Sequence, residues 1–390
     1  MVVESRSKSP HLLGRCCMSF TRSASRQPGP HHTRQDNLLG FLFTQAQSSQ
    51  IKSQVAELYS RALDVCSFVQ RQAVGSVVKF PQEVSSDELP RIQRLYLTSA
   101  NICLYAQRPD DAIRDYSMGI ELMIQPPFHE DAPYTMREFV LASFVAGYLV
   151  QVSPSRPFPR PLAECFSDDI NFTTSSGMLT GVNILQAVRS SGDGVLRALL
   201  HLDGNVLPFL LLLPEQVARI PTVLFSNSMG ILPAICKSTG TPSQTYAPSE
   251  YTRQQANTTT VNIILALAKY FQEIPSSPSS VSIFGLSGLP NINNALSILF
   301  YYLALSISPS PSTFNNMGIV LASAPSAISW TSDTGETDIL SGADLAKIFY
   351  RSGLQLDPLH PHLLTNLGSS YKDEGNLEAA IQYVCYLAPS

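Results

Sequence analysis

Apolar side chains recur every three or four residues in many segments of this chain, which is the spacing of amphipathic helices. Two such segments near the C-terminus are HLLTNLGSSYKDE and LEAAIQYVCYL, and Gly375 between them marks a turn. The small residues Gly368 and Ala380 allow two antiparallel helices to approach closely, and Leu367 and Tyr371 fill the space around that contact. The pattern therefore predicts a tightly packed helix pair.

The spacing within this pair is that of a tetratricopeptide repeat, a helix–turn–helix unit of about 34 residues. Leu364, Leu367, Gly368 and Tyr371 are in phase, and Ala380 follows twelve residues after Gly368. Other segments contain small or aromatic residues in the same phase. They are Ala100, Ala112, Tyr116 and Gly119 in one segment, Tyr301 and Ala304 in the next, and Gly318, Ala346, Tyr350 and Gly353 in the third.

One of these predicted repeats contains an insertion. Twenty-eight residues, rather than twelve, separate Gly318 from Ala346. The inserted segment APSAISWTSDTGETDILSG is rich in Ser, Thr and Gly, so it is expected to be a surface loop that carries the chain's single tryptophan, Trp330.

The predicted fold class is all-α: a tetratricopeptide-repeat helical solenoid with long inter-helix loops and a disordered N-terminus. Four regions are expected. They are a basic tail at 1–36, a repeat-like helical block at 37–152, a Pro-rich connector with irregular helices at 153–256, and a second repeat block at 257–390 whose last repeat is truncated. QVAELYSRALDV, in the first block, has the pattern of a lone second helix.

The amino-acid composition argues against a nucleic-acid-binding protein and against a membrane-spanning one. Of 390 residues, 44% are hydrophobic and 14% charged, and the net charge of −4 gives no reason to expect a nucleic-acid partner. The apolar stretches 139–152 and 206–214 fall short of the roughly 20 residues that a membrane span needs, so they are expected to be buried helices. Scattered cysteines indicate a reducing compartment. A cytoplasmic and/or nuclear location is expected, and the Ser/Arg-rich N-terminus leaves a mitochondrial one open.

The sequence contains no phosphate-binding loop, zinc-protease motif or nucleophile elbow. His360 and His362 lack the Cys or acidic residues of a metal site and are expected at a helix junction. We therefore expect no catalytic residue, metal or cofactor within the chain.

The function that remains is binding. In a repeat superhelix, the residue two positions before the small glycine faces the concave groove. Asn316 and Asn366 occupy this position, where an amide can pair with a peptide backbone.

Two alternatives remain for these asparagines. They are either groove residues or ordinary solvated residues. A groove that clamps a carboxylate would instead carry Lys or Arg where this chain has Asn315 and Ile319, which argues against that type of site.

The segments YRSGLQLDPLHPHLLTNLGSSYKDEGNLEAAIQ, FNNMGIVLAS and LRALLHLDGNVLPFLLLLPEQVARIP resemble fungal proteins similar to protein O-linked N-acetylglucosamine transferase. The resemblance implies a superhelix that presents polypeptide substrates to a C-terminal glycosyltransferase domain using UDP-N-acetylglucosamine. It also implies an asparagine ladder, which Asn316 and Asn366 match by position. After Gln382 the likeness ends, and no segment matches a catalytic domain.

Three functional hypotheses follow: a polypeptide-binding scaffold without its own catalysis, an active transferase that needs residues beyond this chain, and a generic repeat adaptor. A hydrolase or metal enzyme within 153–256 has little support. The expected partners are polypeptide substrates or other proteins. Leu377, Ile381 and Val384 form an apolar stripe on the last helix, which predicts a frayed end, self-association through the C-terminal repeat, or a truncated gene product.

Overall fold

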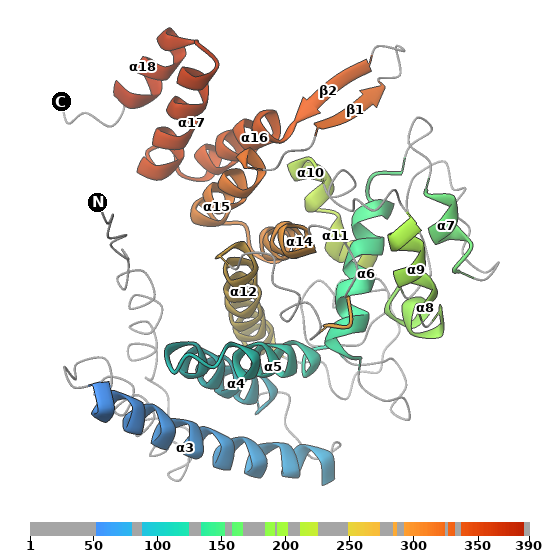
Figure 1. Ribbon diagram of the computed structural model, residues 1–390, viewed down its shortest axis with the longest axis vertical. Helices are drawn as coiled ribbons and strands as arrows, with labels where there is room; N and C mark the ends of the chain where they lie inside the picture. The colour runs from blue at the N-terminus through green and yellow to red at the C-terminus, as the bar shows by residue number, and fades with distance from the viewer. Residues whose placement is uncertain are drawn as a thin grey trace, which may run out of the picture. The chain divides into compact units, whose positions relative to one another are not determined.

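The computed structural model describes residues 52–79, 88–124, 134–152, 158–166, 184–191, 193–201, 211–224, 249–273, 284–286, 292–323, 327–331 and 337–385. These residues are helical almost throughout, which confirms the prediction of an all-α chain with one local exception (Figure 1). The chain divides into two compact units, residues 1–69 and 70–390. The predicted disordered tail at 1–36 lies outside the described residues.

The first unit contains most of helix α3 (Lys52–Lys79), which includes the segment predicted as a lone second helix. Tyr59, Ala62, Cys66 and Val69 are buried and recur every three or four residues, so one face of this helix is apolar. Arg61 and Glu57 form an ion pair on the exposed side.

Among the residues that the structure describes, the second unit contains four antiparallel helix pairs. They are α4 (Glu88–Tyr105) with α5 (Pro109–Glu121), α12 (Glu250–Glu273) with α14 (Ile292–Ile307), α15 (Pro311–Ala322) with α16 (Gly342–Leu356), and α17 (Pro361–Asp373) with α18 (Leu377–Cys385). The pairs pack one on the next in this order, through α4 and α5 against α12, α14 against α15, and α16 against α17 (Figure 1).

Glycines allow the closest of these contacts. A Cβ atom at Gly318 would lie 2.6 Å from Cδ1 of Tyr350, within the α15–α16 pair. A Cβ atom at Gly353 would lie 2.6 Å from Leu363 Cδ1 and 2.9 Å from Phe314 Cβ. All three distances are shorter than atomic contact permits, so a larger side chain at either glycine would push the helices apart. Gly375, with φ of 79°, forms the left-handed turn between α17 and α18.

The contact between the first two pairs has the same geometry, although more than a hundred residues separate α5 from α12 in the sequence. A Cβ atom at Gly119 of α5 would lie 2.7 Å from Ile263 of α12, as Gly353 of α16 faces Leu363 of α17. Ile263 precedes the buried Ala268 by five residues, and Leu363 precedes Gly368 by the same number. Gln93 and Thr260, both buried, add a 2.6 Å hydrogen bond between α4 and α12. Both contacts therefore bring a glycine of a second helix against a branched apolar side chain of the next pair.

The intervening segment folds beside the pairs. Its helices are α6 (Met136–Leu149), α7 (Arg160–Ala163), α8 (Ile184–Ser191), α9 (Gly194–His201), α10 (Pro214–Val217) and α11 (Ile220–Leu224). Helix α6 is buried along almost its whole length and packs on α8 and α11, as expected for the apolar stretch at 139–152. Most of the stretch at 206–214 lies outside the described residues.

This segment attaches to the second helices of the pairs. Its main contacts join α6 to α5, α11 to α14, and α10 to both α14 and α16 (Figure 1). The buried hydroxyl of Tyr302 in α14 accepts a 3.0 Å hydrogen bond from the backbone N–H of Leu212 and so fixes one of these contacts. The outer faces of α4, α12, α15 and α17, the first helices, are not the main attachment surface.

The inserted segment between α15 and α16 is not simply a loop, and that expectation was wrong. Strand β1 (Ala327–Thr331) pairs antiparallel with β2 (Thr337–Ser341), with Trp330 opposite Asp338. The strand segments AISWT and TDILS contain β-branched and aromatic residues, and the segment between them is rich in turn-forming residues. Ser341 ends β2 and caps α16, where its hydroxyl accepts from the backbone N–H of Asp344.

None of the described helices combines the length and the apolar character that crossing a membrane would require.

Candidate polypeptide-binding face

Asn316 and Asn366 lie on adjacent first helices, α15 and α17, which are in contact. Each asparagine precedes a buried glycine by two residues, and Gly318 faces Tyr350 of the partner helix α16. Residues two apart on a helix point to nearly opposite sides, so each asparagine lies away from its buried glycine. Asn316 is exposed and Asn366 is half-buried. Among the described residues, the Asn316 amide has no hydrogen-bond partner, so its bonds are to solvent.

The Asn366 amide is held by a neighbouring helix. Its Nδ2 donates a 2.8 Å hydrogen bond to Oδ1 of Asn315, which is only 8% exposed. This bond connects the two first helices directly. The two asparagines therefore differ in the hydrogen-bonding groups that they can offer a ligand. Asn316 is open to solvent, and Asn366 has one N–H donor already in use.

Most of the exposed side chains within one turn of the two asparagines on their helices have no ionisable group, and the exception is His362 on α17. Ile319, one turn after Asn316, is 40% exposed, and Ser312, Thr365 and Ser369 are exposed on the same two helices. The nearby cations of α16 are engaged elsewhere. Lys347 pairs with Asp344 and Glu374, and Arg351 donates to the Tyr371 hydroxyl. A face with amides, hydroxyls and one apolar side chain suits hydrogen bonding to a peptide backbone more than clamping a carboxylate.

The asparagines do not continue along the other first helices. In α12 the buried small residue is Ala268, whose carbonyl accepts a 2.9 Å hydrogen bond from Ser297 of α14. Ala266 therefore occupies the position of Asn316, and Thr98 occupies it in α4, two residues before Ala100. The sequence pattern missed Ala268 because the facing residue of α14, Ser297, follows it by 29 residues rather than the twelve of the repeat.

The predicted structural positions are almost all in the interior. The buried ones are Ala100, Ala112, Gly119, Ala304, Gly318, Ala346, Gly353, Leu367, Gly368 and Ala380. Tyr371 is half-buried, and its ring stacks on Tyr383 with the centroids 5.6 Å apart. These residues hold the helices together and leave the asparagines as the accessible part of the predicted site.

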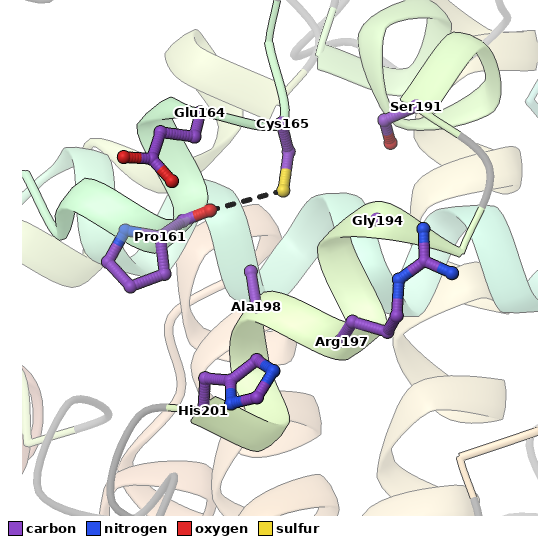
Figure 2. A pocket seen from close by; sticks show the side chains of 8 residues that line it. All are labelled: Pro161, Glu164, Cys165, Ser191, Gly194, Arg197, Ala198 and His201. Atoms are coloured by element: carbon purple, nitrogen blue, oxygen red, sulfur yellow. Dashed lines mark hydrogen bonds between the residues drawn. The ribbon is translucent and has the colours of Figure 1, made fainter.

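A separate open pocket of about 450 Å³ lies between α7, α8 and α9 (Figure 2). Its lining includes Cys165, Glu164, Arg197 and His201. The Cys165 thiol donates a 3.2 Å hydrogen bond to the Pro161 carbonyl, and Figure 2 shows His201 beyond Ala198 from this thiol. Burial raises the pKa of Cys165, and the nearby Arg197 only partly opposes it. The thiol therefore lacks the activation that a nucleophile requires.

We expect Cys165 to alkylate slowly, because a raised pKa lowers the fraction of reactive thiolate at neutral pH. Iodoacetamide labelling, followed by mass spectrometry of the Cys165 peptide, measures this rate in the folded and the urea-unfolded chain. The folded rate should be several-fold lower and should rise toward the unfolded rate as the pH increases. A folded thiol that reacts faster than the unfolded one would show activation instead.

No cluster of three or more His, Cys, Asp or Glu side chains within the described part of the chain could hold a metal ion. His360 caps α17, and its Nδ1 accepts a hydrogen bond from the backbone N–H of Leu363 at 3.4 Å. This places His360 at the helix junction where the sequence predicted it.

Among known families, no family model matches this chain. The search of curated proteins likewise finds no match. The resemblance to the transferase-like fungal proteins therefore stays a prediction.

Proposed function

We propose that this chain is a polypeptide-binding scaffold of the tetratricopeptide type, whose binding face is formed by the first helices α15 and α17. The observation that carries the proposal is the placement of Asn316 and Asn366 on two adjacent first helices, among uncharged and accessible side chains. Stacked helix pairs of this kind present their first helices along a concave surface. The equivalent docking of Gly119 on Ile263 and of Gly353 on Leu363 supports a regular stack.

The attachment of the intervening segment to α5, α14 and α16 supports the same proposal. These are second helices, which form the convex side of such a stack. The described helices of this segment pack on the convex side, so they leave the first-helix side of α15 and α17 available to a partner. The partner we propose is an extended, uncharged stretch of polypeptide, held mainly through its backbone.

Replacing both asparagines by alanine is expected to weaken binding of an extended peptide by about tenfold to a hundredfold. Each amide forms at least one hydrogen bond to the peptide, and two such bonds contribute about 1–3 kcal/mol in total. The probe is an end-capped, uncharged peptide of Ser, Thr, Ala and Val, about ten residues long. Fluorescence anisotropy measures its Kd for the unmodified chain and for Asn316→Ala/Asn366→Ala.

The matched control is Asn294→Ala, since Asn294 is an exposed asparagine on the second helix α14. It should bind the probe like the unmodified chain, and all variants should keep the same circular dichroism. Equal affinity for the double variant and the control would remove the asparagines from the binding site. An unmodified chain that binds no peptide of this class would contradict the proposed function itself.

We further propose that this scaffold is the substrate-recognition part of a protein resembling an O-GlcNAc transferase, and that the chain has no transferase activity by itself. The alternatives are an active transferase, if catalytic residues come from outside this chain, and a generic repeat adaptor. Incubation with an acceptor peptide and labelled UDP-N-acetylglucosamine distinguishes them. Sugar transfer by the purified chain would establish the first alternative.

Self-association through the last helix pair remains a proposal too. Leu377 and Ile381 are 60% and 61% exposed and lie one turn apart on α18. Ile113 of α5 and Ile298 of α14, which correspond to Ile381, are fully buried. Pro109 and Asn294, which correspond to Leu377, are exposed, so only the position of Ile381 is covered in these two earlier pairs.

A further inference from the structure

Asn315 differs from the two asparagines of the proposed binding face. It precedes Gly318 by three residues rather than two, and only 8% of its surface is exposed. Its Oδ1 accepts the 2.8 Å hydrogen bond from Nδ2 of Asn366, across the contact between α15 and α17. A buried amide oxygen on one helix thus holds an accessible amide on the next.

A side-chain amide has two N–H donors and an oxygen with two acceptor sites. With one N–H bonded to Asn315, Asn366 retains its Oδ1 and one N–H for a ligand. Turning the Asn366 amide over by itself would bring its oxygen against the oxygen of Asn315, and the hydrogen bond would be lost. With the Asn315 Oδ1 facing α17, the bond therefore fixes which edge of the Asn366 amide faces outward.

We propose that Asn315 is a positioning residue of the polypeptide-binding face, which orients Asn366 so that its Oδ1 accepts a backbone N–H of the bound chain. This inference rests on the proposed function. An amide fixed before binding loses less conformational freedom when the ligand arrives, so the orientation raises affinity. It also discriminates between ligands: a residue with a backbone N–H is favoured at this position, and proline or an N-methylated residue there binds more weakly.

The distance between the two asparagines determines how far apart along the peptide their contacts lie. Adjacent packed helices lie about 8–10 Å apart, and an extended chain advances about 3.3 Å per residue. Asn316 and Asn366 therefore contact peptide units about three residues apart. Asn316, which has no partner among the described residues, adapts to either a donor or an acceptor. Only the peptide unit bound at Asn366 is therefore expected to need its backbone N–H for binding.

The test is an N-methyl scan of the Ser, Thr, Ala and Val probe, in which each backbone N–H is replaced in turn. With the unmodified chain, methylation at one position should weaken binding by about tenfold. With Asn315→Ala, the unmethylated probe should bind about three- to tenfold more weakly, and the methylation penalty at that position should fall to about twofold. A merely structural role for Asn315 would lower affinity without changing the pattern of the scan.

Asn315→Asp is the matched variant, because a carboxylate oxygen can accept the same hydrogen bond from Asn366. It should retain both the affinity and the methylation penalty of the unmodified chain. If Asn315→Ala changes neither quantity while Asn366→Ala still weakens binding, the positioning role is overturned and the binding face stands. If the unmodified chain does not bind the unmethylated probe, the proposed function fails, and the positioning role fails with it.

Discussion

Phe349→Ala is expected to lower the free energy of unfolding by about 3–5 kcal/mol, the cost of removing a large aromatic side chain from a packed interior. Phe349 of α16 is fully buried. Its ring centroid lies 5.9 Å from that of Tyr302 in α14 and 6.0 Å from that of Phe314 in α15. One side chain therefore connects three helices that belong to two successive pairs, and its loss leaves a cavity where the pairs dock. Urea denaturation followed by circular dichroism measures the change.

The control for this prediction is Leu359→Ala, which also truncates a large apolar residue. Leu359 lies after the end of α16 and is 69% exposed, so its replacement should change stability by less than about 0.5 kcal/mol. Equal losses for the two variants would mean that the α14–α16 interface does not stabilise the fold in the way described.

Gly318→Ala is expected to cost about 1–3 kcal/mol of stability, the range for adding a carbon to a tightly packed contact. Alanine favours a helix over glycine by up to about 1 kcal/mol, which acts in the opposite direction. The clash prevails because the new Cβ would meet the buried ring of Tyr350, which cannot move without displacing α16 from α15. Thermal or urea denaturation of the variant measures the net effect.

A double-mutant cycle with Tyr350→Leu isolates this contact. Leucine removes the ring atoms nearest to Gly318, so Gly318→Ala should cost much less in the Tyr350→Leu background than in the unmodified chain. Strictly additive losses would show that the two residues do not interact. A gain in stability for Gly318→Ala alone would show that only helix propensity matters at this position.

The helices of residues 292–385 could be predicted from the sequence because local signals agree there. Apolar spacing, small residues at Gly318 and Gly353, and the turn glycine Gly375 all indicate the same helix pairs, and the helices α14 to α18 follow them. The hairpin β1–β2 was missed because Ser, Thr and Gly dominate the composition of the insertion, which hides two five-residue strands.

The docking of α5 on α12 could not be predicted, since it depends on contacts between segments far apart in the chain. Neither Gly119 nor Ile263 carries a local signal of the other. The same holds for the binding face. The sequence indicated Asn316 and Asn366 by their phase, but the role of Asn315 depends on the distance between α15 and α17, which only tertiary packing determines.

Locating a bound peptide on the chain tests directly whether the first helices α15 and α17 form the binding face. The Ser, Thr, Ala and Val probe, carrying one benzophenone side chain, is cross-linked to the unmodified chain by light, and mass spectrometry identifies the residues attached. We predict attachment on α15 and α17, close to Asn316 and Asn366, and its loss in Asn316→Ala/Asn366→Ala. Attachment mainly on α14, α16 or the helices α6 to α11 would contradict a binding face formed by the first helices.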